Sequence, residues 1–237
     1  RRLRDEQPLY YNDKHDFFAL SRYDDVATCS ADWKTYISSK GTLLELIRSD
    51  FPIPPGSIIF EDPPDHDLHR ALLSRVFRPK KIAELEPKIR EFCARSLDPL
   101  IGAGGFDFIA NLGAEMPMRT IGYLLGIPEA DQVAIREVID ASLKMNEDGT
   151  PALPDGELGN ADMFADYIDW RAKNPSDDLM TELLEAEFED TDGNTRRLSR
   201  DEVLGYVQLI AAAGNETTTR LIGWTGKVLA EHPDQRR

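Results

Sequence analysis

One long stretch, residues 199–233, carries the strongest structural signals in the sequence and most constrains the fold. Ser199 and Glu202 have the spacing of a capping box, and Pro233 marks where a helix has to end. A helix over this stretch would be roughly 50 Å long at ~1.5 Å per residue, which is enough to cross a whole domain. The sequence therefore predicts a central helix against which the other elements pack.

The middle of this helix is unusual for a purely structural element. Gly214 costs about 1 kcal/mol relative to alanine, and the three threonines 217–219 lose side-chain freedom in a helix. Thr217 can also bond to the carbonyl group of Ala213, which bends a helix. Small residues beside an acid, Glu216, and a hydroxyl group favour a flat ligand with proton delivery next to it. A close helix–helix crossing is the alternative, and this segment alone does not separate the two.

A second segment, residues 62–76, combines a helix start with two cationic side chains. Residues 62–65 read Asp-Pro-Pro-Asp, in which Asp62 can cap a helix and proline is favoured in the first turn. His66 and Arg70 are four residues apart and share one helix face, where they can bind a carboxylate with charge-assisted hydrogen bonds. The alternative is a solvated face with local ion pairs to Asp62 or Asp67.

Both segments resemble signatures of the cytochrome P450 family, the haem-thiolate monooxygenases. Residues 213–218, Ala-Gly-Asn-Glu-Thr-Thr, are similar to the motif of the family's central helix. Residues 62–70, Asp-Pro-Pro-Asp-His-Asp-Leu-His-Arg, resemble the motif of its third helix. The order of the remaining segments also resembles the family, so the resemblance covers the whole chain.

The resemblance implies roles for six residues. They comprise a proton relay and an oxygen-orienting hydroxyl group (Glu216 and Thr217), a surface over the haem (Ala213 and Gly214) and a grip on a haem propionate (His66 and Arg70). The implied cofactor is b-type haem, whose iron takes a cysteine thiolate ligand. The loop that carries this cysteine in the family is not found before Arg237, so no metal ligand is assigned in this chain.

The segments before the central helix give further expectations. Aromatic runs at residues 9–11 and 17–20 flank a turn signal and predict a hairpin, which is followed by a short helix through Cys29. The segment 41–60 is apolar and rich in proline, so it is expected to cover another part of the protein. The resemblance implies a loop that contacts substrate, and the alternative is a loop that caps the core. Residues 146–156 form a polar loop between two predicted helices and match the mobile lid of the family.

Two further helices are predicted from local signals. Pro87 is expected to begin one helix, and residues 176–188 are expected to form another. The fold class is thus mainly α, a cytochrome P450 fold with a small N-terminal β-hairpin. Residues 1–237 are interpreted as the incomplete N-terminal part of a single domain, truncated before the haem-ligating cysteine loop. Cys29 and Cys93 are expected to be inert.

Composition limits the partners. The formal net charge is −15, which argues against nucleic acid and anionic membrane surfaces, and no apolar run reaches the roughly 18 residues of a membrane span. Without a secretory signal, and with only two cysteines, a cytoplasmic protein is expected. The resemblance implies an apolar small-molecule substrate, dioxygen and a ferredoxin-type or other electron donor.

Two functions follow as hypotheses. The intact protein is expected to be a monooxygenase that hydroxylates an apolar small molecule, whereas this chain alone is expected to be inactive because it lacks the iron ligand. The alternative is a non-catalytic helical binding module for an apolar ligand or a partner protein, in which Gly214 serves helix packing.

Overall fold

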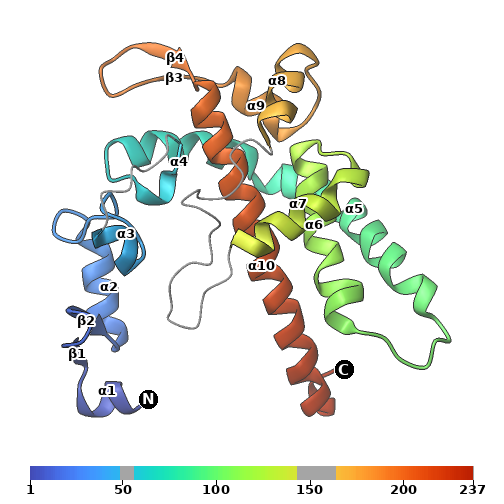
Figure 1. Cartoon of the computed structure of the whole chain (residues 1–237), viewed down its shortest axis with the longest axis horizontal. Helices are drawn as coiled ribbons and strands as arrows, with labels where there is room; N and C mark the ends of the chain where they lie inside the picture. Colours follow the sequence, from blue (N-terminus) through green and yellow to red (C-terminus); the bar gives the residue numbers. More distant parts are fainter. Residues whose placement is uncertain (49–55, 143–163, 237) are drawn as a thin grey trace. The chain divides into compact units, whose positions relative to one another are not determined.

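The computed structural model of the chain describes residues 1–48, 56–142 and 164–236 (Figure 1). Contacts between residues divide the chain into two compact units, with boundaries that include one after Ile58 and one after Asp67. The first unit holds α1 (Arg2–Glu6), β1 (Leu9–Asn12), β2 (Phe17–Leu20), α2 (Tyr23–Ala31) and α3 (Leu44–Arg48). Two elements contribute to both units, namely η1 (Ile58–Phe60) and α4 (Asp65–Val76).

The second unit is almost entirely helical. Its helices are α5 (Pro79–Leu97), η2 (Asp98–Leu100), the π-helix η3 (Ile109–Gly113), α6 (Glu115–Leu125), α7 (Glu129–Ser142), α8 (Ala165–Lys173), α9 (Leu179–Glu185), α10 (Arg200–Glu231) and η5 (Pro233–Arg236). A short hairpin, β3 (Glu187–Glu189) and β4 (Thr195–Arg197), lies between α9 and α10. In the described residues of both units together, helices dominate, which confirms the predicted fold class.

In the first unit, the predicted hairpin is confirmed. β1 and β2 pair in antiparallel register, with Leu9 opposite Leu20, and Asn12 Oδ1 accepts a hydrogen bond from the backbone N–H of His15 in the turn. The short helix α2 follows as expected, although it runs past Cys29 to Ala31. Aromatic and aliphatic residues in the two strands, with turn residues between them, account for this local structure.

Helix α10 is the long element of the second unit, as predicted (Figure 1). Its capping box is complete, because Ser199 Oγ accepts from the N–H of Glu202 and the Glu202 carboxylate accepts from the N–H of Ser199. The helix packs against α6, α7, α8, α9 and η3. With 32 residues it is about 48 Å long.

The hydrophobic core of the second unit surrounds the first half of α10. Val203, Tyr206 and Val207 of this helix are fully buried, and they contact apolar side chains from the neighbouring helices. The largest of these partners are Met118, Ile121, Leu125, Ile135, Phe164, Ile168, Leu179, Met180 and Leu183. Burial of this face fixes the rotation of α10 about its axis and thus decides which residues of its second half remain open.

The end of the apolar segment 41–60 packs onto this core. Ile58 is buried, and Gly56 has a φ of 78° at a point where an added Cβ atom would lie 2.9 Å from the Cα atom of Glu202. Gly56 is therefore needed both for its backbone conformation and for close approach to α10. Residues 49–55 lie outside the described residues, as do residues 143–163, which include the predicted lid.

Three local predictions are wrong. Pro87 lies inside α5, which begins instead at Pro79, in the first turn, where a missing N–H group costs nothing. Phe188 belongs to strand β3 and not to a helix, because it pairs with Arg196 across the turn and packs under the guanidinium group of that residue. Asp62 does not cap α4, since its carboxylate accepts hydrogen bonds from Ser38 and Ser39.

Among the described residues, no helix combines the length and apolarity needed to cross a membrane.

Candidate functional site

The centre of α10 presents an open strip of small and polar residues. Ala213 and Thr217 are both exposed, one helical turn apart, although the preceding turns of the same helix are buried. Thr217 Oγ1 donates a hydrogen bond to the carbonyl oxygen of Ala213 at 2.6 Å, as the sequence predicts. Thr219 makes the same type of bond to the carbonyl oxygen of Asn215 at 2.9 Å. Two such bonds in one turn compete with the helical ladder and mark this segment as locally weakened.

Gly214 faces a different direction from this open strip. A Cβ atom added to it would lie 2.8 Å from Ile121 Cγ1 and still closer to Ile121 Cδ1 of helix α6. Gly214 therefore permits α6 to approach α10, which is the close helix crossing that the sequence left open as an alternative. Asn215, next in sequence, is also on the buried side, and its Oδ1 accepts no hydrogen bond from the residues that the structure describes.

Glu216 lies beside the open strip and is held by a neighbour on the same helix. Arg220 Nε donates to Glu216 Oε1 at 2.7 Å, and Arg220 Nη2 bonds to the same oxygen. The Glu216 side chain is 28% exposed, whereas that of Arg220 is 73% exposed. Sequence reasoning overlooked Arg220, although an acid followed four residues later by an arginine is a recognisable helical ion pair.

The second predicted pair lies on α4. His66 Nδ1 is 3.5 Å from Asp67 Oδ1, one of the local partners that the sequence allows, and Arg70 is exposed. His66 belongs to the first unit and Arg70 to the second. Only their spacing of four residues along α4 therefore indicates that they share a helix face. His69 is buried and meets Phe188 and Tyr206 edge-on, which agrees with a structural role.

Asp62 stabilises the chain before α4 in place of capping it. Its two carboxylate oxygens accept hydrogen bonds from the backbone N–H groups of Ser38 and Ser39, at 2.7 and 3.2 Å. The bond from Ser38 is the main reason why the pKa of Asp62 is lowered. The main partners of Asp62 are thus backbone N–H groups more than twenty positions earlier, and the charge of His66 adds a smaller lowering of the pKa of Asp62.

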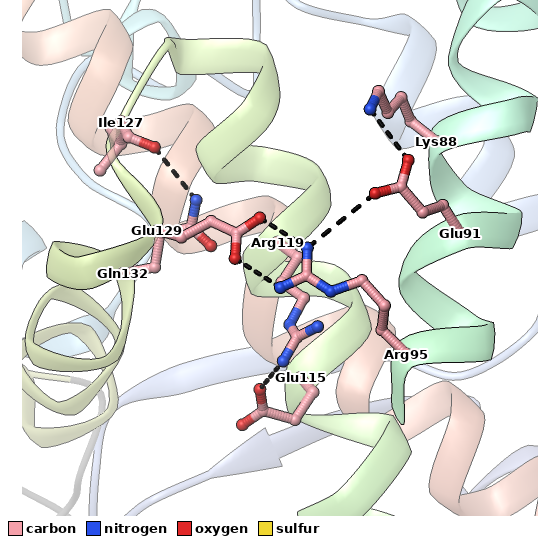
Figure 2. A network of polar contacts seen from close by, with 8 residues as sticks. All are labelled: Lys88, Glu91, Arg95, Glu115, Arg119, Ile127, Glu129 and Gln132. Atoms are coloured by element: carbon pink, nitrogen blue, oxygen red, sulfur yellow. Dashed lines mark hydrogen bonds and ion pairs between the residues drawn. The ribbon is translucent and has the colours of Figure 1, made fainter. Parts of the chain in front are cut away.

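A polar network away from α10 ties three helices together (Figure 2). Arg95 of α5 forms a bidentate ion pair with Glu129 of α7, with both N–O distances at 2.7 Å. Glu115 of α6 accepts hydrogen bonds from Arg136 of α7 at 3.0 Å and from Arg119 of its own helix at 3.3 Å. The hydrogen bond from Arg95 lowers the pKa of Glu129. Since Arg95 and Glu129 are about half exposed, the network contributes modestly to packing and offers no arrangement for catalysis.

Comparison with known proteins shows which proteins this chain is similar to. No family model matches the sequence. The chain is 35% identical over 240 residues to the protein named cytochrome P450 123 in Mycobacterium tuberculosis, and 33% identical over 238 residues to cytochrome P450 109 of Bacillus spizizenii. These alignments take in 99% and 97% of this chain but only 58% and 55% of the relatives.

Solved structures agree with these relatives. Cytochrome P450 CYP109Q5 from Chondromyces apiculatus superposes with a TM-score of 0.81 at 32% identity, over 99% of this chain and 58% of that one. The fold is the mainly helical fold of cytochrome P450s. The chain spans little more than half the length of its curated relatives. The chain therefore belongs, as a partial sequence, to the cytochrome P450 family, whose members carry haem.

Proposed function

We propose that this chain provides the distal side of a haem-thiolate monooxygenase, and that its two compact units belong to one cytochrome P450 domain. The observation that carries the proposal is the open strip of α10, where Ala213 and Thr217 are exposed although the first half of the same helix is packed in the core. Ala213 presents only a methyl group, so a flat macrocycle can lie against it. Thr217 then places its hydroxyl group at the same face, one turn further along.

The side chains of this strip have distinct tasks in the proposed reaction. Haem, when bound, supplies the redox centre at which dioxygen is reduced and oxygen is transferred to the substrate. Thr217 donates a hydrogen bond to the Ala213 carbonyl oxygen, so the lone pairs of Oγ1 remain to accept a hydrogen bond from a water molecule and orient it. Glu216 carries protons on its carboxylate from solvent to that water, as a general acid and base.

The cofactor is proposed to be held from α4 and ligated from outside this chain. His66 and Arg70 would bind a propionate with charge-assisted hydrogen bonds, for which His66 has to exchange its contact with Asp67. The haem is proposed to be b-type, with a cysteine ligand beyond Arg237. Cys29 and Cys93 are both only half-buried, and neither is given a role in ligation.

The proposed substrate is an apolar small molecule, and the proposed co-substrates are dioxygen and electrons from a ferredoxin-type or other donor. Relatives with established names support this class, since one from Mycobacterium tuberculosis with 29% identity is named steroid C26-monooxygenase, and one from Mycobacterium marinum was solved with pseudoionone. A cytoplasmic location is proposed because the sequence holds only two cysteines, as is usual in a reducing compartment.

The proposal is tested by the spectrum of the reduced carbon monoxide complex. A protein of the relatives' full length that contains this chain is expected to bind haem, to give a thiolate-type Soret band and to hydroxylate an apolar substrate. This chain alone, mixed with haem, is expected to give no such band. Full-length protein without haem or without the band would favour the alternative, a helical binding module. A thiolate band from the chain alone would instead make Cys29 or Cys93 a ligand.

A further inference from the structure

The ion pair between Glu216 and Arg220 has a geometry that bears on proton transfer. Both bonds from Arg220, through Nε and Nη2, fall on a single carboxylate oxygen, Oε1. Arg220 therefore leaves Oε2 unengaged and anchors the carboxylate group at Oε1. Two donors of a planar guanidinium group restrict this anchored oxygen more than a single donor of an ammonium group does.

The ion pair between Glu216 and Arg220 differs from an ordinary surface pair because one of its partners is partly buried. The Glu216 side chain is 28% exposed at the edge of the open strip, whereas Arg220 reaches into solvent with 73% of its side chain exposed. Arg220 brings a positive charge to this partly buried carboxylate from the solvent side. The same helix offers a comparison, since Lys227 pairs with Glu231 at the same spacing but with both side chains more than half exposed.

We propose that Arg220 is a positioning residue for Glu216, an inference that rests on the proposed function. Arg220 holds Oε1, so that Oε2 is the oxygen that accepts a proton from solvent and gives it up toward Thr217. Loss of Arg220 lets the Glu216 side chain rotate among its conformers, and the proton is then delivered from a correctly placed carboxylate in only a fraction of encounters. Substrate binding does not involve this contact and stays unchanged.

The first test does not depend on catalysis. Exchange of the Arg220 Nε–H proton with water is measured by NMR in the haem-bound, full-length protein. The wild-type proton is expected to exchange slowly, and Glu216→Gln is expected to accelerate exchange, because the charge-assisted bond becomes a neutral one. Equal exchange rates in wild type and Glu216→Gln would overturn the inference, since the ion pair would then not persist in solution.

The second test measures turnover with a matched control. Arg220→Gln is expected to lower kcat about tenfold with KM unchanged, and to increase the solvent deuterium isotope effect, because proton delivery becomes slower. Arg220→Lys is expected to restore part of the loss, since it keeps the charge but not the two-point geometry. Lys227→Gln removes a helical ion pair of the same spacing and is expected to behave like wild type.

The outcomes separate the inference from the proposed function. Wild-type turnover with normal kcat and isotope effect in Arg220→Gln would overturn the role of Arg220 and leave the monooxygenase intact. A loss in Arg220→Gln that Lys227→Gln reproduces would also overturn it, because it would reflect helix stability alone. Haem-bound wild type that hydroxylates nothing would overturn the proposed function, and with it the catalytic role of Arg220.

Discussion

Single residues on α10 show how far a motif can be interpreted without a structure. The sequence identifies residues 213–217 as a weakened helical segment and predicts the bond from Thr217 to Ala213, because both follow from local chemistry. It cannot show that Gly214 meets Ile121, since Ile121 lies more than ninety residues earlier and is brought there by packing. Of the two small residues assigned to the cofactor, Ala213 is open, whereas Gly214 permits a helix crossing.

Substitution of Gly214 tests this helix crossing. Gly214→Ala gains about 1 kcal/mol of helix propensity, but its new Cβ atom overlaps Ile121, which is buried. Overpacking of this kind costs about 1–3 kcal/mol, so a net loss of stability is expected in urea unfolding. In an Ile121→Val background, which removes the nearest carbon atom, the same substitution is expected to cost less. Stabilisation by Gly214→Ala in both backgrounds would contradict the crossing.

At the scale of elements, the first turn of α10 combines a cap with an ion pair. Glu202 closes the capping box with Ser199 and also forms a bidentate pair with Arg196 of β4, at 2.8 and 2.9 Å. Burial alone would raise the pKa of Glu202, but the hydrogen bonds from Arg196 and Ser199 outweigh it and the pKa is lowered. The capping box is predictable from sequence, whereas the partner on the hairpin is not, because the pairing of β3 with β4 brings Arg196 to Glu202.

The lowered pKa of Glu202 predicts an acid-sensitive helix start. A carboxyl group with a lower pKa in the folded state stabilises the fold above its unfolded pKa, and this contribution is lost as pH falls through the folded value. Glu202→Gln, which keeps the cap but loses the charge, is expected to cost about 1–2 kcal/mol at neutral pH and nothing at low pH. The measurement is the thermal midpoint of wild type and variant between neutral and acid pH.

A matched control lies on the same hairpin. Glu187 pairs with Arg197 at 2.9 Å, but its side chain is 59% exposed, so Glu187→Gln is expected to change stability by less than about 1 kcal/mol at any pH. If Glu202→Gln showed the same small and pH-independent change, the buried ion pair would not hold the start of α10.

At the scale of the whole molecule, helix starts and hairpin turns were easier to predict than helix continuity. The boundaries of α10 and the first hairpin follow from capping residues, proline and turn residues, which act within a few positions. The local signals at Pro87 predict a helix start, yet α5 continues through this residue because Leu85 and Phe92 on either side are buried. Helix continuity there is decided by packing between distant segments, which a single sequence does not display.

The family was also predictable because several short motifs occur in the right order, and the relatives confirm it over nearly all of this chain. The roles of the individual site residues remain predictions. They include the propionate grip of His66 and Arg70, whose two residues lie on either side of the division between units.

The central claim is that the open strip of α10 handles oxygen and protons, and the most direct measurement is product formed per reductant consumed in the full-length enzyme. Thr217→Ala keeps good helix propensity, so haem content is expected to be normal while most reductant is consumed without hydroxylation and peroxide is released. Glu216→Gln is expected to slow turnover about 10²–10⁴-fold.

Two controls keep the hydroxyl chemistry apart from helix geometry. Thr217→Ser retains the hydroxyl group and is expected to keep most of the coupling, whereas Thr219→Ala removes an equivalent bond to a helix carbonyl elsewhere on α10 and is expected to couple like wild type. A low product-to-reductant ratio confined to Thr217→Ala is the predicted result. A wild-type ratio in Thr217→Ala, together with normal turnover in Glu216→Gln, would contradict the account and leave α10 with a packing role alone.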